Sequence, residues 1–116
     1  METKETELAT AARDNQLQTM ERLIAEGVST YAEDRWGTPA LVLAARYGNL
    51  DALKLLRRHG ANLDATDVSG WTALMRAAAN VNADCAEALL EWGADVDAAG
   101  NDGNTALHLA ARFGQL

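Results

Sequence analysis

The chain has 116 residues, of which 17 are acidic and 10 are Lys or Arg, so its formal net charge is −7. This length corresponds to one domain, and 48% hydrophobic with 23% charged residues excludes a wholly disordered chain. The acidic balance argues against a nucleic-acid partner. No apolar run is long enough to cross a bilayer, so membrane insertion is not expected either.

Residues that could form a disulfide or a metal site are few. Cys85 is the single cysteine, so an intrachain disulfide is excluded. One Cys and two His residues are too few for the usual ligands of a structural zinc site. The N-terminus is polar and lacks the apolar run of a secretory signal. We therefore expect a cytoplasmic protein, or a nuclear one in a eukaryotic host, with no metal and no cofactor.

A period of 33 residues organises the whole sequence. It divides the chain into the units 1–33, 34–66, 67–99 and 100–116. Sliding the sequence over itself by this spacing aligns Leu8, Leu41, Leu74 and Leu107; Ala11, Ala44, Ala77 and Ala110; Leu23, Leu56 and Leu89; Gly27, Gly60 and Gly93; and Gly37, Gly70 and Gly103.

The unit 34–66 shows the predicted elements most clearly. Gly37 suits a tight turn, and residues 39–47 form a short helical pattern with Leu and Ala on one face. Asn49 is placed as the N-cap of a second helix, which ends at a left-handed Gly60. Unit 67–99 repeats this order, unit 1–33 begins with its first helix, and unit 100–116 contains a first helix alone.

Each predicted helix is shorter than the ~12–15 residues that an isolated helix needs in water. Stacking similar units buries each apolar stripe against the next unit, and small alanines at the contacts permit a close approach. The sequence therefore predicts an all-α helical solenoid, stabilised by contacts between neighbouring units.

Two segments of the repeat resemble the ankyrin family. The sequences GWTAL (70–74) and GNTALHLAA (103–111) are similar to its G-x-T-P-L-H-x-A-A signature, and LLEWGADVD (89–97) is similar to its L-L-x-x-G-A-D-V-N segment. The resemblance implies an ankyrin-repeat solenoid of paired antiparallel helices with protruding turns. It implies an N-terminal capping repeat at 1–33, ankyrin repeats at 34–66 and 67–99, and an incomplete repeat at 100–116.

Pro39 departs from the repeated pattern, because it occupies the column of Thr72 and Thr105. Proline is favoured in the first turn of a helix. We expect Thr38 to cap this helix and Pro39 to lie in its first turn, so that the helix begins one residue earlier than its counterparts.

Two further positions depart from the pattern. Val81 occupies the column of Gly48, and valine resists left-handed backbone geometry. Either Asn80 makes that turn or the bend differs. Gly100 takes the place of the aspartate that begins the two preceding turns, which should weaken the side-chain bonding of the last turn.

The chain stops at Leu116, which aligns with the first stripe residue of a second helix. We expect from this that the sequence is a fragment of a longer array. Apolar residues at this end would then be exposed, or would support self-association: Leu107, Ala110, Ala111 and Leu116.

Enzyme motifs are absent from the sequence: there is no G-x-S-x-G, no P-loop and no G-x-G-x-x-G. The resemblance implies that His108 bonds the neighbouring loop backbone. We assign His59 to a helix end, Cys85 to the core, and Asp95 and Asp97 to a turn. No catalytic residue is therefore expected.

The resemblance implies a concave groove formed by the turn tips and the exposed faces of the first helices. The predicted partner-binding residues are Arg13, Asp14, Arg35, Trp36, Thr38, Arg46, Tyr47, Val68, Ser69, Trp71, Asn80, Asn101, Asp102, Asn104, Arg112 and Phe113. Aromatic residues and Arg are enriched as anchors of protein interfaces.

Structural roles for the same residues are the alternative. Arg13, Arg46 and Arg112 form a row with Ala79 as its gap, and this row could instead pair with the turn carboxylates Asp34 and Asp67. Trp71 could pack between adjacent turns. Trp92 and Tyr31 lie elsewhere and are assigned to packing.

The functional prediction is non-catalytic recognition of a protein partner through the concave face, with an acidic or aromatic epitope as one possible target. The alternative is a structural spacer or cap within a larger enzyme or channel. A small enzyme or metal protein is the third hypothesis, and it would require a pocket lined by His108 and acidic residues.

Overall fold

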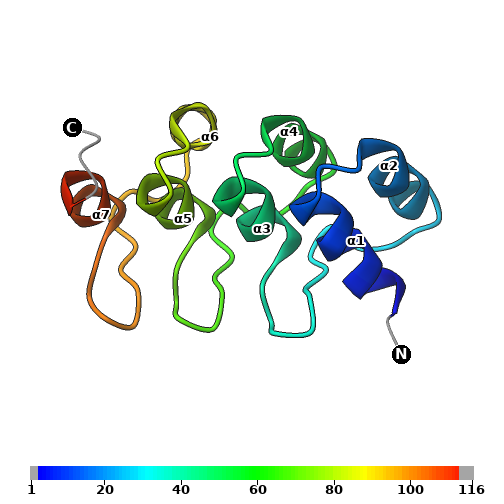
Figure 1. Cartoon of the computed structure of the whole chain (residues 1–116), viewed down its shortest axis with the longest axis horizontal. Helices are drawn as coiled ribbons and strands as arrows, with labels where there is room; N and C mark the ends of the chain where they lie inside the picture. The colour runs from blue at the N-terminus through cyan, green and yellow to red at the C-terminus, as the bar shows by residue number, and fades with distance from the viewer. Residues whose placement is uncertain (1–2, 113–116) are drawn as a thin grey trace.

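The computed structural model describes residues 3–112, and within this range the chain forms helices without named strands. Figure 1 shows two rows of helices, in which α1, α3, α5 and α7 lie side by side and α2, α4 and α6 pack against them. This is the predicted all-α solenoid. The helices are α1 (Lys4–Arg13), α2 (Leu17–Ala25), α3 (Ala40–Arg46), α4 (Leu50–Arg58), α5 (Ala73–Ala79), α6 (Ala83–Glu91) and α7 (Ala106–Arg112).

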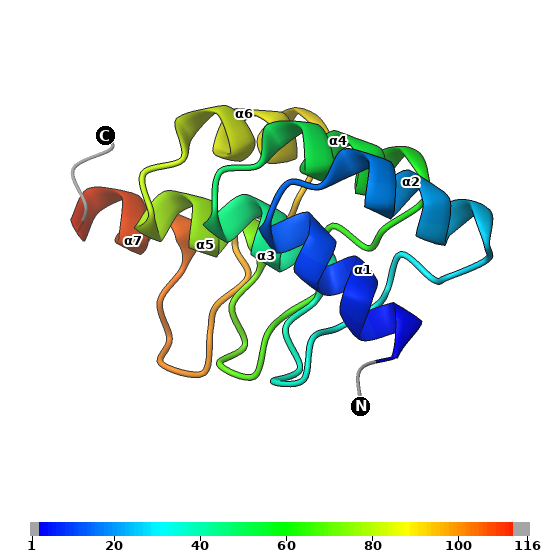
Figure 2. The same cartoon turned by 45° about the vertical axis from the view of Figure 1, so that its right-hand side comes forward.

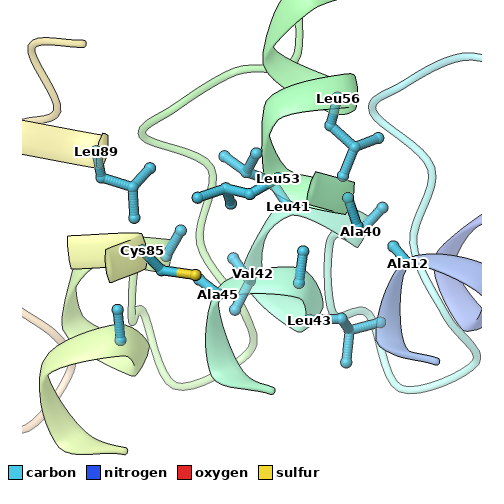
Figure 3. Packing of buried hydrophobic residues seen from close by; sticks show 14 of the residues in the cluster. Ala12, Ala40, Leu41, Val42, Leu43, Ala45, Leu53, Leu56, Cys85 and Leu89 are labelled. Carbon is cyan, nitrogen blue, oxygen red and sulfur yellow. The ribbon is translucent and has the colours of Figure 1, made fainter. Parts of the chain in front are cut away.

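The core between the two rows is built from alanine and leucine. Ala40 and Ala44 of α3 are fully buried, and their small side chains allow α3 to pack closely against its neighbours α1 and α5. Leu53 and Leu56 of α4 are fully buried beside them (Figure 3). Cys85 of α6 is 1% exposed, and its side chain points toward α3. Close packing of small residues explains how a chain with 5% aromatic residues still has a continuous core.

The turns that precede α3, α5 and α7 protrude together on one side of the helices (Figure 2). An aspartate organises each of the first two turns. Asp34 Oδ1 accepts hydrogen bonds from the backbone N–H groups of Trp36 and Thr38, both at 2.9 Å. Gly37 supplies the left-handed residue of this turn, with φ of 77°. Such side-chain bonds hold a turn in one conformation before any partner binds.

Pro39 lies outside helix α3, so the prediction that it occupies the first helical turn is wrong. Its backbone is extended, with φ −62° and ψ 147°, and α3 begins at Ala40 in register with α5. The turn is the physical reason: Thr38 N–H bonds Asp34 Oδ1, and Thr38 O accepts from the N–H of Asp34. Thr38 is therefore held in the turn and cannot cap. Pro39 stands at the N-cap position without a side-chain cap bond.

Val81 itself adopts the left-handed conformation, with φ of 58°, whereas Asn80 has φ −100°. The prediction that Asn80 makes the turn, or that the bend differs, is therefore wrong. The backbone after Val81 is fixed by the N–H of Asn82, which bonds Ala77 O at 2.9 Å. A regular connection between the two helices requires a left-handed residue here, and the surrounding bonds impose it on valine.

Asn49 and Asn82 stand at the N-cap positions of α4 and α6, but their side chains do not cap these helices. Each carboxamide reaches back to the preceding repeat unit. Asn82 Nδ2 donates to Ala45 O and Arg46 O at 2.9 Å, and Asn49 makes the equivalent pair of bonds at the end of α1. These asparagines therefore satisfy carbonyls at the C-terminal end of the neighbouring helix. The predicted N-cap positions are confirmed, whereas the side-chain cap bond expected of them is absent.

Candidate functional site

The predicted partner-binding residues lie in two places, the protruding turns and the C-terminal ends of the helices in the first row. We call this set the turn–helix face. Trp36 in the first turn is 63% exposed, Tyr47 after α3 is 52% exposed, and Val68 in the second turn is 74% exposed. Phe113 lies outside the described residues. In turn order the others are Arg35 and Thr38; Ser69 and Trp71; and Asn101, Asp102 and Asn104. At the helix ends lie Arg13 and Asp14, Arg46, Asn80 and Arg112.

Aromatic rings on this face stand next to arginines. The Arg35 guanidinium carbon lies 5.1 Å from the centre of the Trp36 ring. The corresponding distance from Arg46 to Tyr47 is 5.5 Å. Both are within the range of a cation–π contact. These contacts hold large exposed side chains in defined positions.

The arginine row does not pair with the turn carboxylates. Arg13 instead binds Asp14, with Nε–Oδ1 and Nη2–Oδ2 distances of 3.0 and 3.1 Å. This bond is the largest cause of the lowered pKa of Asp14. Arg112 Nη2 lies 3.5 Å from Asn104 Oδ1. The alternative in which the row serves the turn aspartates is therefore wrong.

Arg76 is the residue that pairs with a turn carboxylate, and it is not among the predicted site residues. Its Nε and Nη2 atoms lie 2.8 and 2.6 Å from Oδ2 of Asp67, whose side chain is 5% exposed. Its guanidinium also stacks over Trp71, at 4.3 Å from the ring centre. The position belongs to the column of Leu43 and Leu109, both buried. A charged residue in a core leucine column was the available signal.

Trp71 packs between adjacent turns, as the structural alternative proposed. A Cβ atom at Gly100 would lie 2.4 Å from Cδ1 of its indole ring, which explains why the turn aspartate is absent there. Asp102 partly replaces it, because its Oδ1 accepts from the N–H of Asn104 at 3.1 Å. This hydrogen bond is the largest cause of the lowered pKa of Asp102. Asn101 ties the same turn back to Val68 O and Ser69 O.

Charge is unevenly divided between this face and the rest of the chain. Five arginines lie at or just beneath the turn–helix face, against four carboxylates, whereas the remaining sequence has five basic and thirteen acidic residues. The four carboxylates are Asp14, Asp34, Asp67 and Asp102. Each is already bonded, either to an arginine or to turn N–H groups. The face is therefore the least acidic region of a strongly acidic chain.

Comparison with known proteins identifies the repeat. A family model described as "Ankyrin repeats (3 copies)" matches residues 8–100, and a model described as "Ankyrin repeat" matches residues 102–116. The chain belongs to the ankyrin repeat family. A search of curated proteins returned no match. Ankyrin repeats are generally protein–protein interaction modules and are typically non-catalytic.

The remaining Cys, His and Asp side chains that could take part in catalysis are buried in this ankyrin-repeat chain, bonded within their own turn or helix, or located at a helix end. Burial raises the pKa of the Cys85 thiol to about 11, with a smaller contribution from Asp84. His108 Nδ1 accepts from the N–H of Thr105, at the start of its own helix. Asp95 Oδ1 accepts from the N–H of Asp97 within one turn. His59 lies at the C-cap of α4 and is exposed.

Within residues 3–112 no cluster of three or more His, Cys, Asp or Glu side chains could hold a metal ion. No helix in the same range is both long and apolar enough to cross a bilayer. Trp92 is half-buried and lies under Arg57, at 5.3 Å from the guanidinium carbon. Tyr31, assigned to packing, is instead 63% exposed, because it lies in a loop outside the helix rows.

Proposed function

We propose that this ankyrin-repeat chain is a non-catalytic recognition module whose concave face binds a protein partner. The predicted site residues of the turn–helix face are the contact set. The observation that carries the proposal is the exposure of Trp36 and Tyr47, each held beside an arginine. Aromatic residues and Arg are the side chains that most often dominate interface energetics. The proposal includes the repeat units 1–33, 34–66, 67–99 and 100–116, and a cytoplasmic location, or a nuclear one in a eukaryotic host.

Rigid presentation is the proposed mechanism. The first turn is fixed by Asp34, and the second by Asp67 with Arg76. The third is tied to the second through Asn101. A partner therefore meets side chains whose backbone is already ordered, so that little conformational entropy is lost on binding.

The charge distribution supports an acidic epitope, with aromatic residues, as the target. The carboxylates of the face are committed to internal bonds, whereas Arg46 contacts a tyrosine ring and Arg112 a neutral amide oxygen. Such arginines can accept a carboxylate without first losing an internal ion pair. An acidic partner would be repelled by the rest of the chain, which orients its approach.

Site-specific photo-crosslinking in the host cell tests this proposal. A photoreactive amino acid at Trp36 should capture a defined protein, identified by mass spectrometry. The matched probe at Glu21, exposed on α2 away from the turns, should not capture it. Arg46→Glu should reduce the yield at Trp36 at least tenfold if the epitope is acidic. Capture of the same protein equally from both positions, or of none from Trp36, would contradict recognition through this face.

A further inference from the structure

Three cations lie on α4, in the middle of the second row of helices and away from the turn–helix face. Lys54, Arg57 and Arg58 occupy positions i, i+3 and i+4, which share one face of a helix, and all three are exposed. Within residues 3–112 no carboxylate lies at ion-pair distance from any of them. By contrast, Arg22 on the neighbouring α2 binds two glutamates. We call the three residues the α4 cation stripe.

One member of the stripe is held in position by the next repeat unit. The guanidinium carbon of Arg57 lies 5.3 Å from the centre of the Trp92 ring, and Trp92 is half-buried. A cation–π contact orients a guanidinium but does not neutralise its charge. The stripe therefore presents positive charge that no carboxylate in the described part of the chain compensates.

Acidic neighbours limit the width of the stripe. Glu21 of α2 and Glu87 of α6 occupy the column of Lys54 in the units before and after it, and these helices lie on either side of α4 (Figure 1). A flat anionic surface, such as a membrane, would meet both glutamates together with the stripe. A narrow acidic segment that runs along α4 meets the cations alone, so charge complementarity favours such a segment.

A cavity begins where α4 ends. It lies between the loops that follow α2 and α4, and these loops are joined by the Thr30 hydroxyl, which donates to His59 O at 3.4 Å. Tyr31, Ala61 and Ala65 contribute to its apolar lining. Its volume of about 170 Å³ is below the ~300 Å³ of the smallest typical ligand pockets and close to the ~150 Å³ of a cavity that binds benzene. The cavity therefore suits a single apolar side chain.

We infer that α4 and this cavity together bind an acidic segment of a partner protein. The carboxylates of the segment pair with the α4 cation stripe, and one large apolar side chain beside them, such as Leu, Met or Phe, enters the cavity. Glu33 also lines the cavity and is exposed, which disfavours a further carboxylate there and separates the acidic part of the segment from the apolar part. The inference is independent of the proposed function, because it concerns a different surface.

A display library of random twelve-residue peptides tests the inference, with the whole chain as bait. Selected peptides should combine several Asp or Glu residues with one large apolar residue to one side of them. In fluorescence anisotropy, the double variant Arg57→Glu/Arg58→Glu should bind such a peptide at least tenfold more weakly, and added salt should weaken binding to the unmodified chain. Both arginines are exposed, so urea denaturation should show that the double variant still folds.

Two further variants separate the cavity from the stripe. Ala65→Leu should fill part of the cavity and weaken the selected peptide several-fold, but should not affect a peptide whose apolar residue is replaced by alanine. Lys4→Glu is the matched control for charge reversal, because the Lys4 side chain is 64% exposed and lies outside both recognition surfaces. It should leave peptide binding unchanged.

Three results would overturn the inference. The selection could yield no acidic peptides. The double variant could bind the selected peptides as tightly as the unmodified chain while Arg46→Glu loses them, which would assign these peptides to the turn–helix face. Vesicles containing phosphatidylserine could bind the unmodified chain and not the double variant, in place of any peptide, which would assign the stripe to an anionic membrane.

Discussion

Val81 holds a backbone conformation that glycine or asparagine adopts in the other helix connections. Its φ of 58° compares with 70° at Gly48 and 55° at Asn15. For a residue with a β-carbon, the left-handed region is disfavoured by about 1–2 kcal/mol, and β-branching makes valine an outlier there. The chain therefore contains a local strain that a single substitution can release.

We predict that Val81→Gly raises the free energy of unfolding by about 0.5–1 kcal/mol, since relief of the strain exceeds the added chain entropy of glycine. Urea denaturation measures the effect. Asn80→Gly is the control: with φ −100° it has no such strain to release, so it should destabilise. Equal effects at the two positions would show that Val81 is not strained.

Cys85 links stability to alkaline pH. Burial raises its pKa from 9.0 to about 11, so the thiolate forms more readily in the unfolded chain. This thiol therefore contributes its full stability below pH 9, and the contribution decreases as pH rises from 9 to 11. Urea denaturation at pH 8 and pH 10 should show a larger loss for the native chain than for Cys85→Ala. Equal losses of stability between pH 8 and pH 10 in the native chain and in Cys85→Ala would contradict the raised pKa of Cys85.

At the scale of the element, the turn before α5 depends on a contact that repeat periodicity conceals. Asp67 and Gly70 predict the turn, and Asp67 Oδ1 accepts from Ser69 and Trp71 N–H groups as Asp34 does in the preceding turn. Arg76, which stacks over the Trp71 ring, is the charged partner of this carboxylate. A column-by-column comparison shows that Arg76 replaces leucine at that position, but it does not identify Asp67 as the partner.

We predict that Arg76→Leu, although it restores the residue of the other repeats, lowers the free energy of unfolding by about 1.5–3 kcal/mol. The reason is that Asp67 stays buried without its cation. In a Trp71→Thr background the loss should shrink, because water can then reach the carboxylate. A double-mutant cycle in urea measures this coupling, and additive losses would count against it.

At the scale of the whole molecule, asparagines join one repeat unit to the next. Asn82 links α6 to the end of α3 by two hydrogen bonds of 2.9 Å. We predict that Asn82→Ala lowers the free energy of unfolding by about 1–2 kcal/mol. Asn82→Asp should cost more at pH 7, because a carboxylate would face two carbonyl oxygens at a helix C-terminus.

Asn80→Ala provides the comparison for this joint in thermal or urea denaturation. Asn80 bonds a carbonyl of its own helix, Arg76 O at 2.8 Å, and is exposed. Its removal should cost less than removal of the Asn82 side chain. If Asn80→Ala and Asn82→Ala lowered the free energy of unfolding equally, the bonds between units would contribute no more to stability than a bond within one helix.

Most of the fold could be predicted from the sequence, because a 33-residue period repeats the same apolar helix faces and the same glycine turns. The helix predicted at 39–47 is observed at Ala40–Arg46, and the exposure of Leu107 is confirmed. The errors at Pro39, Val81 and Asn49 share one cause: each residue was judged by its local preference, whereas bonds to a turn or to a neighbouring unit fix its conformation. For the candidate site, the sequence indicated Trp36 and Tyr47 but not which arginines have carboxylate partners, because pairing depends on the three-dimensional course of the turns.

The asparagine joints also determine how the chain should respond to a pulling force. Each joint connects one unit only to the unit before it, so tension applied at the two ends loads the joints in series. Loss of Asn82 bonding would weaken the contact between units 34–66 and 67–99 and leave the earlier Asn49 joint intact. Extension should therefore proceed in steps, each releasing one 33-residue unit, or about 110 Å of extended chain. Such a molecule lengthens gradually under load instead of yielding all at once.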